Sequence, residues 1–217
     1  HPTYPFMAVR QLMRRIYTQV TNRKPDGHID FHTSTSMLTP INGWTMTNWC
    51  GEEWTIHRRK PGFFYDQITT LDNLRMNMAW RQFGTPMEFL NYDGVPFTFA
   101  ESLALSLIHD IPTRPDGTYQ KDIIAALAAQ RNQFRADGKA VWYPYWRQPG
   151  AFLDLPTHVK ASAWLKSGDS MLVYISNLDR EEVSFELKCN PAVTGFEAKT
   201  SVLLPSMGYR VLELRKK

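Results

Sequence analysis

The stretch Val183-Ser184-Phe185-Glu186-Leu187 decides how the last part of this chain folds. Apolar and polar side chains alternate strictly along it, which is typical of a β-strand with one buried face. Turn residues such as Ser167-Gly168-Asp169 and Ser206-Met207-Gly208 separate similar segments at short intervals. The spacing predicts a small antiparallel β-sandwich over residues 157–217. Its expected strands cover residues 158–166, 170–177, 182–188, 195–204 and 208–214.

Residues 1–156 show a mixture of helical and strand patterns instead. Apolar residues recur at three- and four-residue steps over 5–20 and 120–137, which predicts two amphipathic helices. Further helices are expected over 70–83 and 97–108, and short strands over 28–32 and 86–92. Residues 33–66 have no clear period and predict a long functional loop. The fold class is therefore α/β plus all-β, with a domain boundary near Pro156.

Composition excludes several classes of function. The chain has 217 residues, 43% of them hydrophobic and 21% charged, which is ordinary for a globular protein. The net charge of +4 is spread along the sequence, so we expect no nucleic-acid partner. No run of 18 apolar residues occurs, so we expect no membrane span. The two cysteines give no zinc spacing, and no Gly-x-Gly-x-x-Gly or Walker pattern is present, so no cofactor is expected.

Aromatic residues are the unusual feature of the composition. They make up 13% of the chain and include seven tryptophans. Hexose rings present flat apolar C–H faces, so an excess of indole rings raises the chance of a carbohydrate ligand. For any single tryptophan, filling of the core remains the simpler explanation.

Three stretches carry a resemblance to known enzymes. The first is Gly27-His28-Ile29-Asp30-Phe31-His32-Thr33-Ser34, and the second is Cys50-Gly51-Glu52-Glu53-Trp54. The third combines residues 171–178 with the closing stretch over residues 204–212, which ends Arg210-Val211-Leu212. Together they resemble the C-terminal part of bacterial proteins related to glycoside hydrolase family 123, with a (β/α)8 barrel followed by a β-sandwich.

The resemblance implies hydrolysis of glycosidic bonds in a carbohydrate substrate. A (β/α)8 barrel takes about 250 residues, so residues 1–156 would hold only its last three or four units. We therefore expect a piece of a longer protein whose upstream segment completes the barrel. The compartment stays open; it would be periplasmic or extracellular if the full-length protein is a secreted bacterial glycosidase.

Glycosidases commonly place two carboxyl groups on either side of the scissile bond. The candidates at expected strand ends or loops are Asp30, Glu52, Glu53 and Asp110. We expect Glu52 and Asp30 to be catalytic, with Glu52 as the general acid, because it follows a glycine and lies among three tryptophans. Family 123 implies an adjacent Asp-Glu pair that assists attack by the N-acetyl group of the sugar. This chain has Glu52-Glu53 instead, so that pair is not carried over.

The expected substrate-binding residues are His32, Trp44, Trp49 and Asp110. His32 and Asp30 are two apart on one strand, so their side chains share a face. Metal binding by Asp30, His32, His57 and Glu52 has no ligand spacing behind it, so we expect no metal site. Two alternatives stay open, namely a non-catalytic carbohydrate-binding protein and a structural remnant of such an enzyme.

Overall fold

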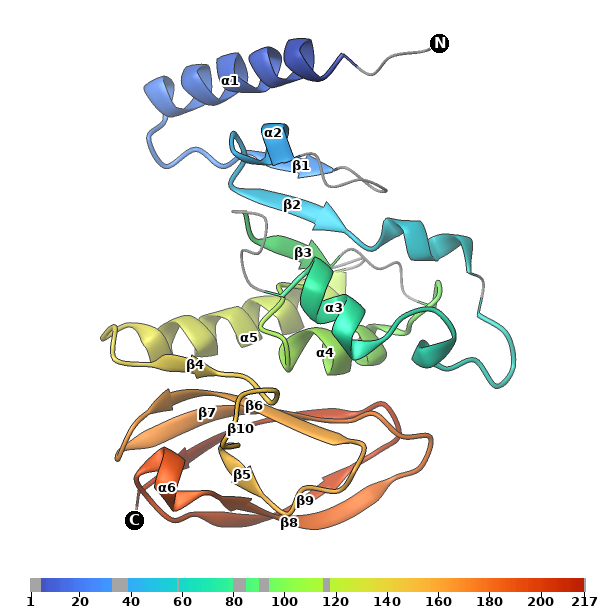
Figure 1. The fold of residues 1–217 in the computed structure, drawn as a ribbon, viewed down its shortest axis with the longest axis vertical. Coiled ribbons are helices and arrows are strands. Elements are labelled where there is room, and N and C mark those ends of the chain that lie inside the picture. Colours follow the sequence, from blue (N-terminus) through green and yellow to red (C-terminus); the bar gives the residue numbers. More distant parts are fainter. Residues whose placement is uncertain are drawn as a thin grey trace.

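The computed structural model describes residues 5–32, 39–57, 59–79, 85–89, 94–114 and 118–216. Helix α1 (Phe6–Arg23) lies at one end of the long axis, and an antiparallel β-sandwich lies at the other (Figure 1). A small parallel sheet and a layer of helices come between them. The protein is thus a mixed α/β chain with separate parallel and antiparallel sheets.

The parallel sheet contains three short strands in the order β1-β2-β3, namely β1 (Asp30–His32), β2 (Thr47–Cys50) and β3 (Met87–Phe89). A parallel bridge from Phe89 to Thr113 extends the sheet beyond β3. The central strand β2 falls inside residues 33–66, so the prediction of an unstructured loop there was wrong. Thr47 and Asn48 are buried although they are polar, and this strand therefore lacks the apolar alternation that marks a strand in sequence.

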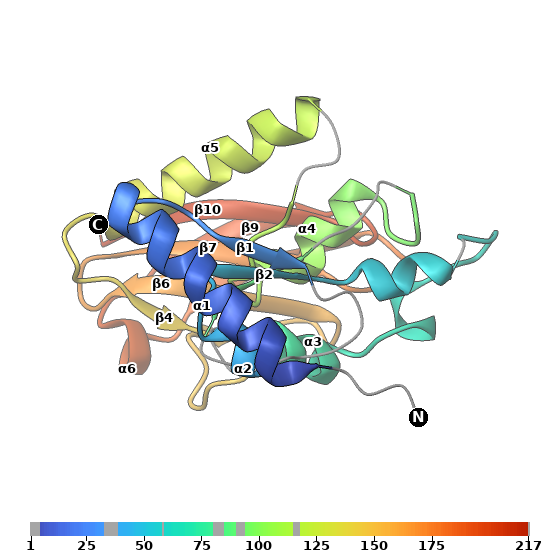
Figure 2. The same cartoon turned by 90° about the horizontal axis from the view of Figure 1, so that it is seen from above.

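Helices cover one face of this sheet. Ile29 and Phe31 pack with the apolar side of α1, which crosses above β1 and β2 (Figure 2). Met87 and Phe89 pack with residues of α3 (Leu71–Asn77) and α4 (Phe99–Leu107). Because side chains alternate along a strand, the polar residues between these apolar ones face the other way. The other described helices before the sandwich are α2 (Thr39–Asn42), α5 (Thr118–Arg135) and the 3-10 turns η1 (Glu52–Ile56) and η2 (Tyr65–Gln67).

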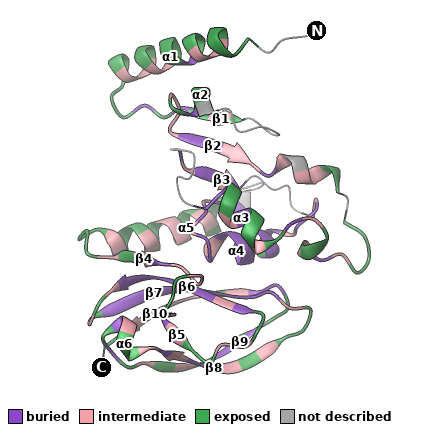
Figure 3. Cartoon of the chain, in the orientation of Figure 1, coloured by how far each residue is buried: buried purple, intermediate pink, exposed green. Residues whose placement is uncertain are grey.

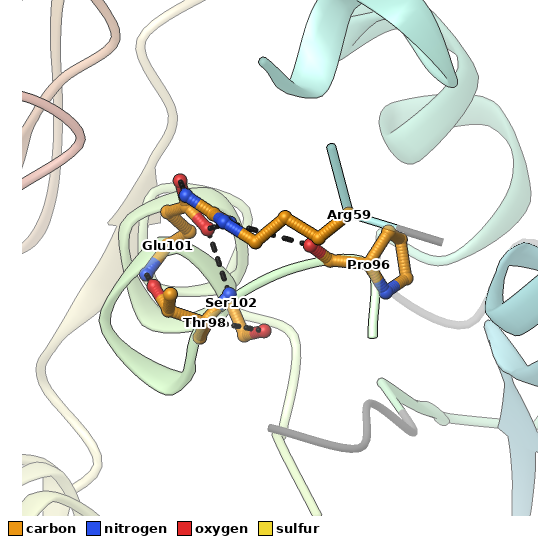
Figure 4. Close-up of polar contacts among 5 residues, drawn as sticks. All are labelled: Arg59, Pro96, Thr98, Glu101 and Ser102. Atoms are coloured by element: carbon orange, nitrogen blue, oxygen red, sulfur yellow. Dashed lines mark hydrogen bonds and ion pairs between the residues drawn. The ribbon is translucent and has the colours of Figure 1, made fainter. Parts of the chain in front are cut away.

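An ion pair between the exposed Arg59 and the buried Glu101 ties the segment after β2 to α4. Thr98 and Glu101 form a capping box, in which each side chain accepts from the backbone N–H of the other residue. The carboxylate of Glu101, only 8% exposed, also accepts two hydrogen bonds from the Arg59 guanidinium, one of them at 3.0 Å (Figure 4). Arg59 further donates to the carbonyl of Pro96 at 3.3 Å. The bidentate pair fixes the path of the chain between β2 and α3.

The sandwich consists of two antiparallel sheets with the orders β10-β7-β6-β4 and β5-β8-β9. Their strands lie within one or two residues of most predicted bounds; the exception is β9, which starts at Lys199. Strands β4 and β5 come from before residue 156, so the sandwich draws on both sides of the predicted boundary. One turn of helix, α6, was not predicted, and it forms between the Asn190 cap and Gly195. The elements are β4 (Val141–Tyr143), β5 (Phe152–Leu153), β6 (Val159–Lys166), β7 (Ser170–Asn177), β8 (Val183–Cys189), α6 (Pro191–Thr194), β9 (Lys199–Leu204) and β10 (Tyr209–Arg215).

Strand β7 is buried along its whole length, whereas α1 and α5 show exposed outer faces (Figure 3). Val173 and Ile175 point into the core between the two sheets. Leu172 and Tyr174 point the other way and pack with Phe134 of α5. This strand therefore joins the sandwich to the helical layer. Among the described residues, none of the helices combines the length and the apolar character needed to cross a bilayer.

We expect Leu172→Ala to lower the free energy of unfolding by about 2–5 kcal/mol, because it opens a cavity at this junction. Leu203→Ala is the matched control, since Leu203 lies on β9 and is 45% exposed. It should change the stability by no more than about 0.5 kcal/mol. Urea unfolding of both variants measures the difference, and equal losses would contradict the two-sided burial of β7.

Candidate functional site

The face of the parallel sheet that the helices leave uncovered carries a row of polar side chains. In the register of the sheet, Asp30 lies beside Thr47 and His32 beside Trp49. Trp49 in turn lies beside Glu88 on β3. Neighbouring residues in a parallel sheet share a face, so these five side chains project to one side. All three strands run in the same direction, which brings their carboxyl ends to one edge, where α/β proteins bind ligands.

His32 and Glu52 form a contact at the carboxyl ends of the strands. The Nε2 atom of His32 lies 2.9 Å from a carboxylate oxygen of Glu52, and each side chain is about one-third exposed. Gly51 makes this possible, because its φ of 113° is a left-handed conformation that other residues rarely adopt. The chain turns there directly from β2 into η1, which returns Glu52 to the end of β1. The indole ring of Trp49 lies beside His32, with ring centroids 5.8 Å apart.

Asp30 has its own set of polar partners. Its Oδ1 atom lies 2.8 Å from His28 Nε2 and accepts a hydrogen bond from the hydroxyl of Thr47. The same His28 nitrogen lies 3.0 Å from the Thr47 hydroxyl. The carboxylate is thus oriented by His28, which precedes β1, and by Thr47 of the adjacent strand β2. Such a carboxylate can orient a bound hydroxyl or take up a proton.

Glu88 is a third acidic residue of the row, and the sequence interpretation missed it. Burial raises the pKa of its carboxyl, and the negative charge of Asp30 raises it further, while the charges of Arg114 and His28 oppose the shift. The Arg114 guanidinium lies over the Trp49 ring, 3.1 Å from its centroid. The pattern Met87-Glu88-Phe89 could have predicted this position. A carboxyl between two buried apolar residues of a strand faces away from the side on which those apolar residues pack.

The tryptophans expected around Glu52 do not enclose it. Trp54 turns into the core and packs edge-on against Phe89 and Phe97. Trp44 precedes β2 and therefore lies at the opposite end of the strand, where it packs against Tyr17 of α1. Of the three rings, only Trp49 lies beside His32, the partner of Glu52.

Asp110 also lies apart from this row. It follows α4 with a φ of 55°, and its side chain is only 7% exposed. Its carboxylate accepts from Arg131 of α5 at 3.3 Å and from the indole N–H of Trp164 at 3.4 Å. Burial raises the pKa of Asp110, while the positive charge of Arg131 lowers it. These contacts make it part of the junction between the helices and the sandwich.

The row thus offers carboxyl and imidazole groups in direct contact, a combination suited to proton transfer. Within the described ranges, no cluster of three or more histidine, cysteine, aspartate or glutamate side chains has the arrangement of a metal site.

Comparison with known proteins gives a structural relative. No protein-family model matches the chain, and no curated protein matches its sequence. Among solved structures, the ligand-free cyclic α-maltosyl-(1→6)-maltose hydrolase from Arthrobacter globiformis superposes with a TM-score of 0.55 and 16% identity. The superposition covers 98% of this chain and 54% of that enzyme. This chain has a glycoside hydrolase-like fold. It spans about half the length of the enzyme that it matches, and at this identity the likeness extends to the fold alone.

Glu88 provides a test of this geometry by its effect on stability. Its pKa is raised above the ordinary value of 4.5, so the folded protein holds the proton to a higher pH than the unfolded chain does. Protonated Glu88 contributes fully to the free energy of unfolding below about pH 4. This contribution is lost as the pH rises through the raised pKa of Glu88 in the folded protein. Glu88→Gln, which cannot ionise, should therefore gain stability relative to the wild type as the pH rises above the ordinary glutamate value of 4.5.

Urea unfolding across that pH range measures the effect. Glu182→Gln is the control, because Glu182 is exposed on the sandwich and should show no such trend. A stability difference between Glu88→Gln and the wild type that stays constant with pH would rule out the buried, Asp30-coupled position of Glu88.

Proposed function

We propose that this chain belongs to a glycoside hydrolase-like protein that hydrolyses glycosidic bonds in a carbohydrate substrate. The observation that carries the proposal is the row of Asp30, Glu52 and Glu88 with the imidazoles of His28 and His32 along one face of a parallel sheet, with Glu52 and His32 at the carboxyl ends of the strands. Hydrolysis of a glycoside needs one carboxyl group to donate a proton and a second to stabilise or activate the attacking group. The glycoside hydrolase-like fold adds independent support.

The parallel sheet is proposed to be a wall segment of a (β/α)8 barrel. Three features support this: the strands are parallel and in consecutive order, helices cover one face, and polar side chains line the other. In a closed barrel the polar face would line the interior and its mouth. Further strands would be needed to close it, and a longer chain is the proposed source. The barrel portion would then end before β4, and the sandwich domain would begin with β4 (Val141–Tyr143) instead of at residue 157.

Within this site we assign Glu52 as the general acid and Asp30 as the second carboxyl group. Glu52 is accessible from solvent and contacts His32, which can hold its proton in place or exchange it. The Trp49 ring lies beside His32 with the Arg114 guanidinium over one of its faces, and the other face is proposed to stack on a sugar ring. Trp44 and Asp110 are not included, because their contacts lie elsewhere.

The finer relation to glycoside hydrolase family 123 rests on the sequence resemblance alone. It would make an N-acetylated sugar the substrate, with the N-acetyl group as the attacking group. The solved relative instead has a cyclic maltosyl-maltose as its named substrate. We therefore propose carbohydrate as the substrate class and include both kinds of sugar in the test.

The experiment compares wild-type protein and Glu52→Gln, expressed from the complete reading frame, on alkyl and nitrophenyl glycosides of both maltose and N-acetylglucosamine. Removal of a general acid costs about 10²–10⁴-fold in turnover when the leaving group needs protonation. We therefore expect a loss of that order on an alkyl glycoside. The loss on a nitrophenyl glycoside should be much smaller, because that leaving group departs without a proton.

Glu182→Gln again serves as the control and should leave both rates unchanged. Equal losses of Glu52→Gln on the two substrates would show that Glu52 is not the acid. Sugar binding without turnover by the wild-type protein would favour the alternative of a non-catalytic carbohydrate-binding protein.

A further inference from the structure

A second aromatic site lies on the other side of the helical layer, where β4 meets the C-terminal end of α5 (Figure 1). A solvent-open pocket of about 580 Å³ is lined there by Trp142, Trp146, Trp164, Arg135 and His109. Its volume lies within the range of about 300–1,000 Å³ that is usual for small-molecule sites. None of these residues belongs to the polar row of the parallel sheet.

The sandwich sheet forms the floor of this pocket. Trp142 and Trp164 are direct neighbours on β4 and β6, so their rings lie on the same outer face of the sheet. The ring centroids are 5.3 Å apart. Helix α5 covers the inner part of this face through Phe134, and Trp164 is only 3% exposed. Trp142 is half-buried and sits on β4, the edge strand of its sheet, where the cover of α5 ends.

The indole ring of Trp146 forms one wall of the pocket and is held between two neighbouring side chains. The His109 ring stacks on Trp146 with centroids 5.6 Å apart, and the guanidinium of Arg75 lies over the same indole ring. His109 is fully buried, and its Nδ1 and Nε2 atoms contact the Leu105 carbonyl and the Tyr145 hydroxyl at 2.6 and 3.1 Å. Burial lowers the pKa of His109 to about 4, so the imidazole is neutral at neutral pH. The wall is therefore held in place before any ligand arrives.

Arg135 supplies the polar groups of the pocket. Its guanidinium lies 3.9 Å from the centroid of the Trp164 ring. No hydrogen bond or ion pair joins its side chain to another described residue, so its N–H donors are available. With His109 neutral, the lining has one positive charge and no carboxylate, which disfavours a cationic ligand. Flat aromatic surface beside a fork of N–H donors matches a sugar ring, which has apolar C–H faces and hydroxyl acceptors at its edge.

We propose that this pocket is a second carbohydrate-binding site, which holds a hexose unit of an oligosaccharide against Trp142 with Arg135 bound to its hydroxyls. The site is separate from the proposed catalytic row, and the inference does not depend on hydrolysis. In a carbohydrate-active protein it would hold a chain on the surface while another part of that chain occupies the catalytic row.

The test follows the indole N–H signals of the seven tryptophans by ¹H–¹⁵N NMR while maltotetraose, cellotetraose or N-acetylated chitotetraose is added. We expect at least one sugar to shift the signals of Trp142 and Trp146. Trp142→Ala should weaken this binding by at least about tenfold, as is usual for a central aromatic contact. Trp44→Phe, which lies against α1, should bind like the wild type.

Arg135→Gln provides a variant that keeps the aromatic rings, and it should weaken binding severalfold while the protein stays folded in thermal melts. The inference is overturned if none of the sugars shifts Trp142 at about 10 mM. It is equally overturned if sugars shift only Trp49, or if both variants bind like the wild type. Binding at Trp142 in a protein that fails to cleave glycosides would support this site and contradict the proposed function.

Discussion

The burial of strand β7 on both faces is the constraint on which the rest of the structure depends. One set of its side chains fills the core between the two sheets of the sandwich, and the other set meets α4 and α5. Ser162 on the adjacent strand adds a hydrogen bond to the carbonyl of Ile108, at 2.6 Å, which holds the end of α4 on the sandwich. Since α4 also packs under β3, the sandwich indirectly positions the parallel sheet and the polar row on it.

The two faces of the parallel sheet have different roles, one in packing and one in the proposed chemistry. Its helix-covered face contains Ile29, Phe31, Met87 and Phe89, whereas the opposite face collects charged and aromatic groups. Such a row is costly to bury unless its members interact, and here Asp30 and Glu52 each have polar partners. Asp30 is held by His28 and Thr47, and Glu52 by His32. The same contacts that satisfy these groups also bring them into an arrangement suited to acid–base chemistry.

The sequence predicted the sandwich and the long helices well, because their patterns are periodic and local. The strict alternation at Val183–Leu187 and the helical steps over 120–137 each indicate one structure only. It failed at β2, whose buried Thr47 and Asn48 resemble loop residues when read alone. It also missed Glu88, whose place in the row depends on the pairing of β3 with β2, which puts it beside Trp49. Three tryptophans that are close in sequence also lie in different places. Trp44 lies at one end of β2, Trp49 lies on the polar face of that strand, and Trp54 lies in the core.

The sequence by itself therefore determined the fold class, the face shared by Asp30 and His32, and the residue types available for chemistry. All of these follow from side-chain periodicity within single elements. Only the tertiary structure decided that Glu52 meets His32, that Glu88 joins Asp30, and that Asp110 belongs to the junction with the sandwich. These pairings depend on the register between strands and on the turn at Gly51, which are set by packing between segments distant in the sequence.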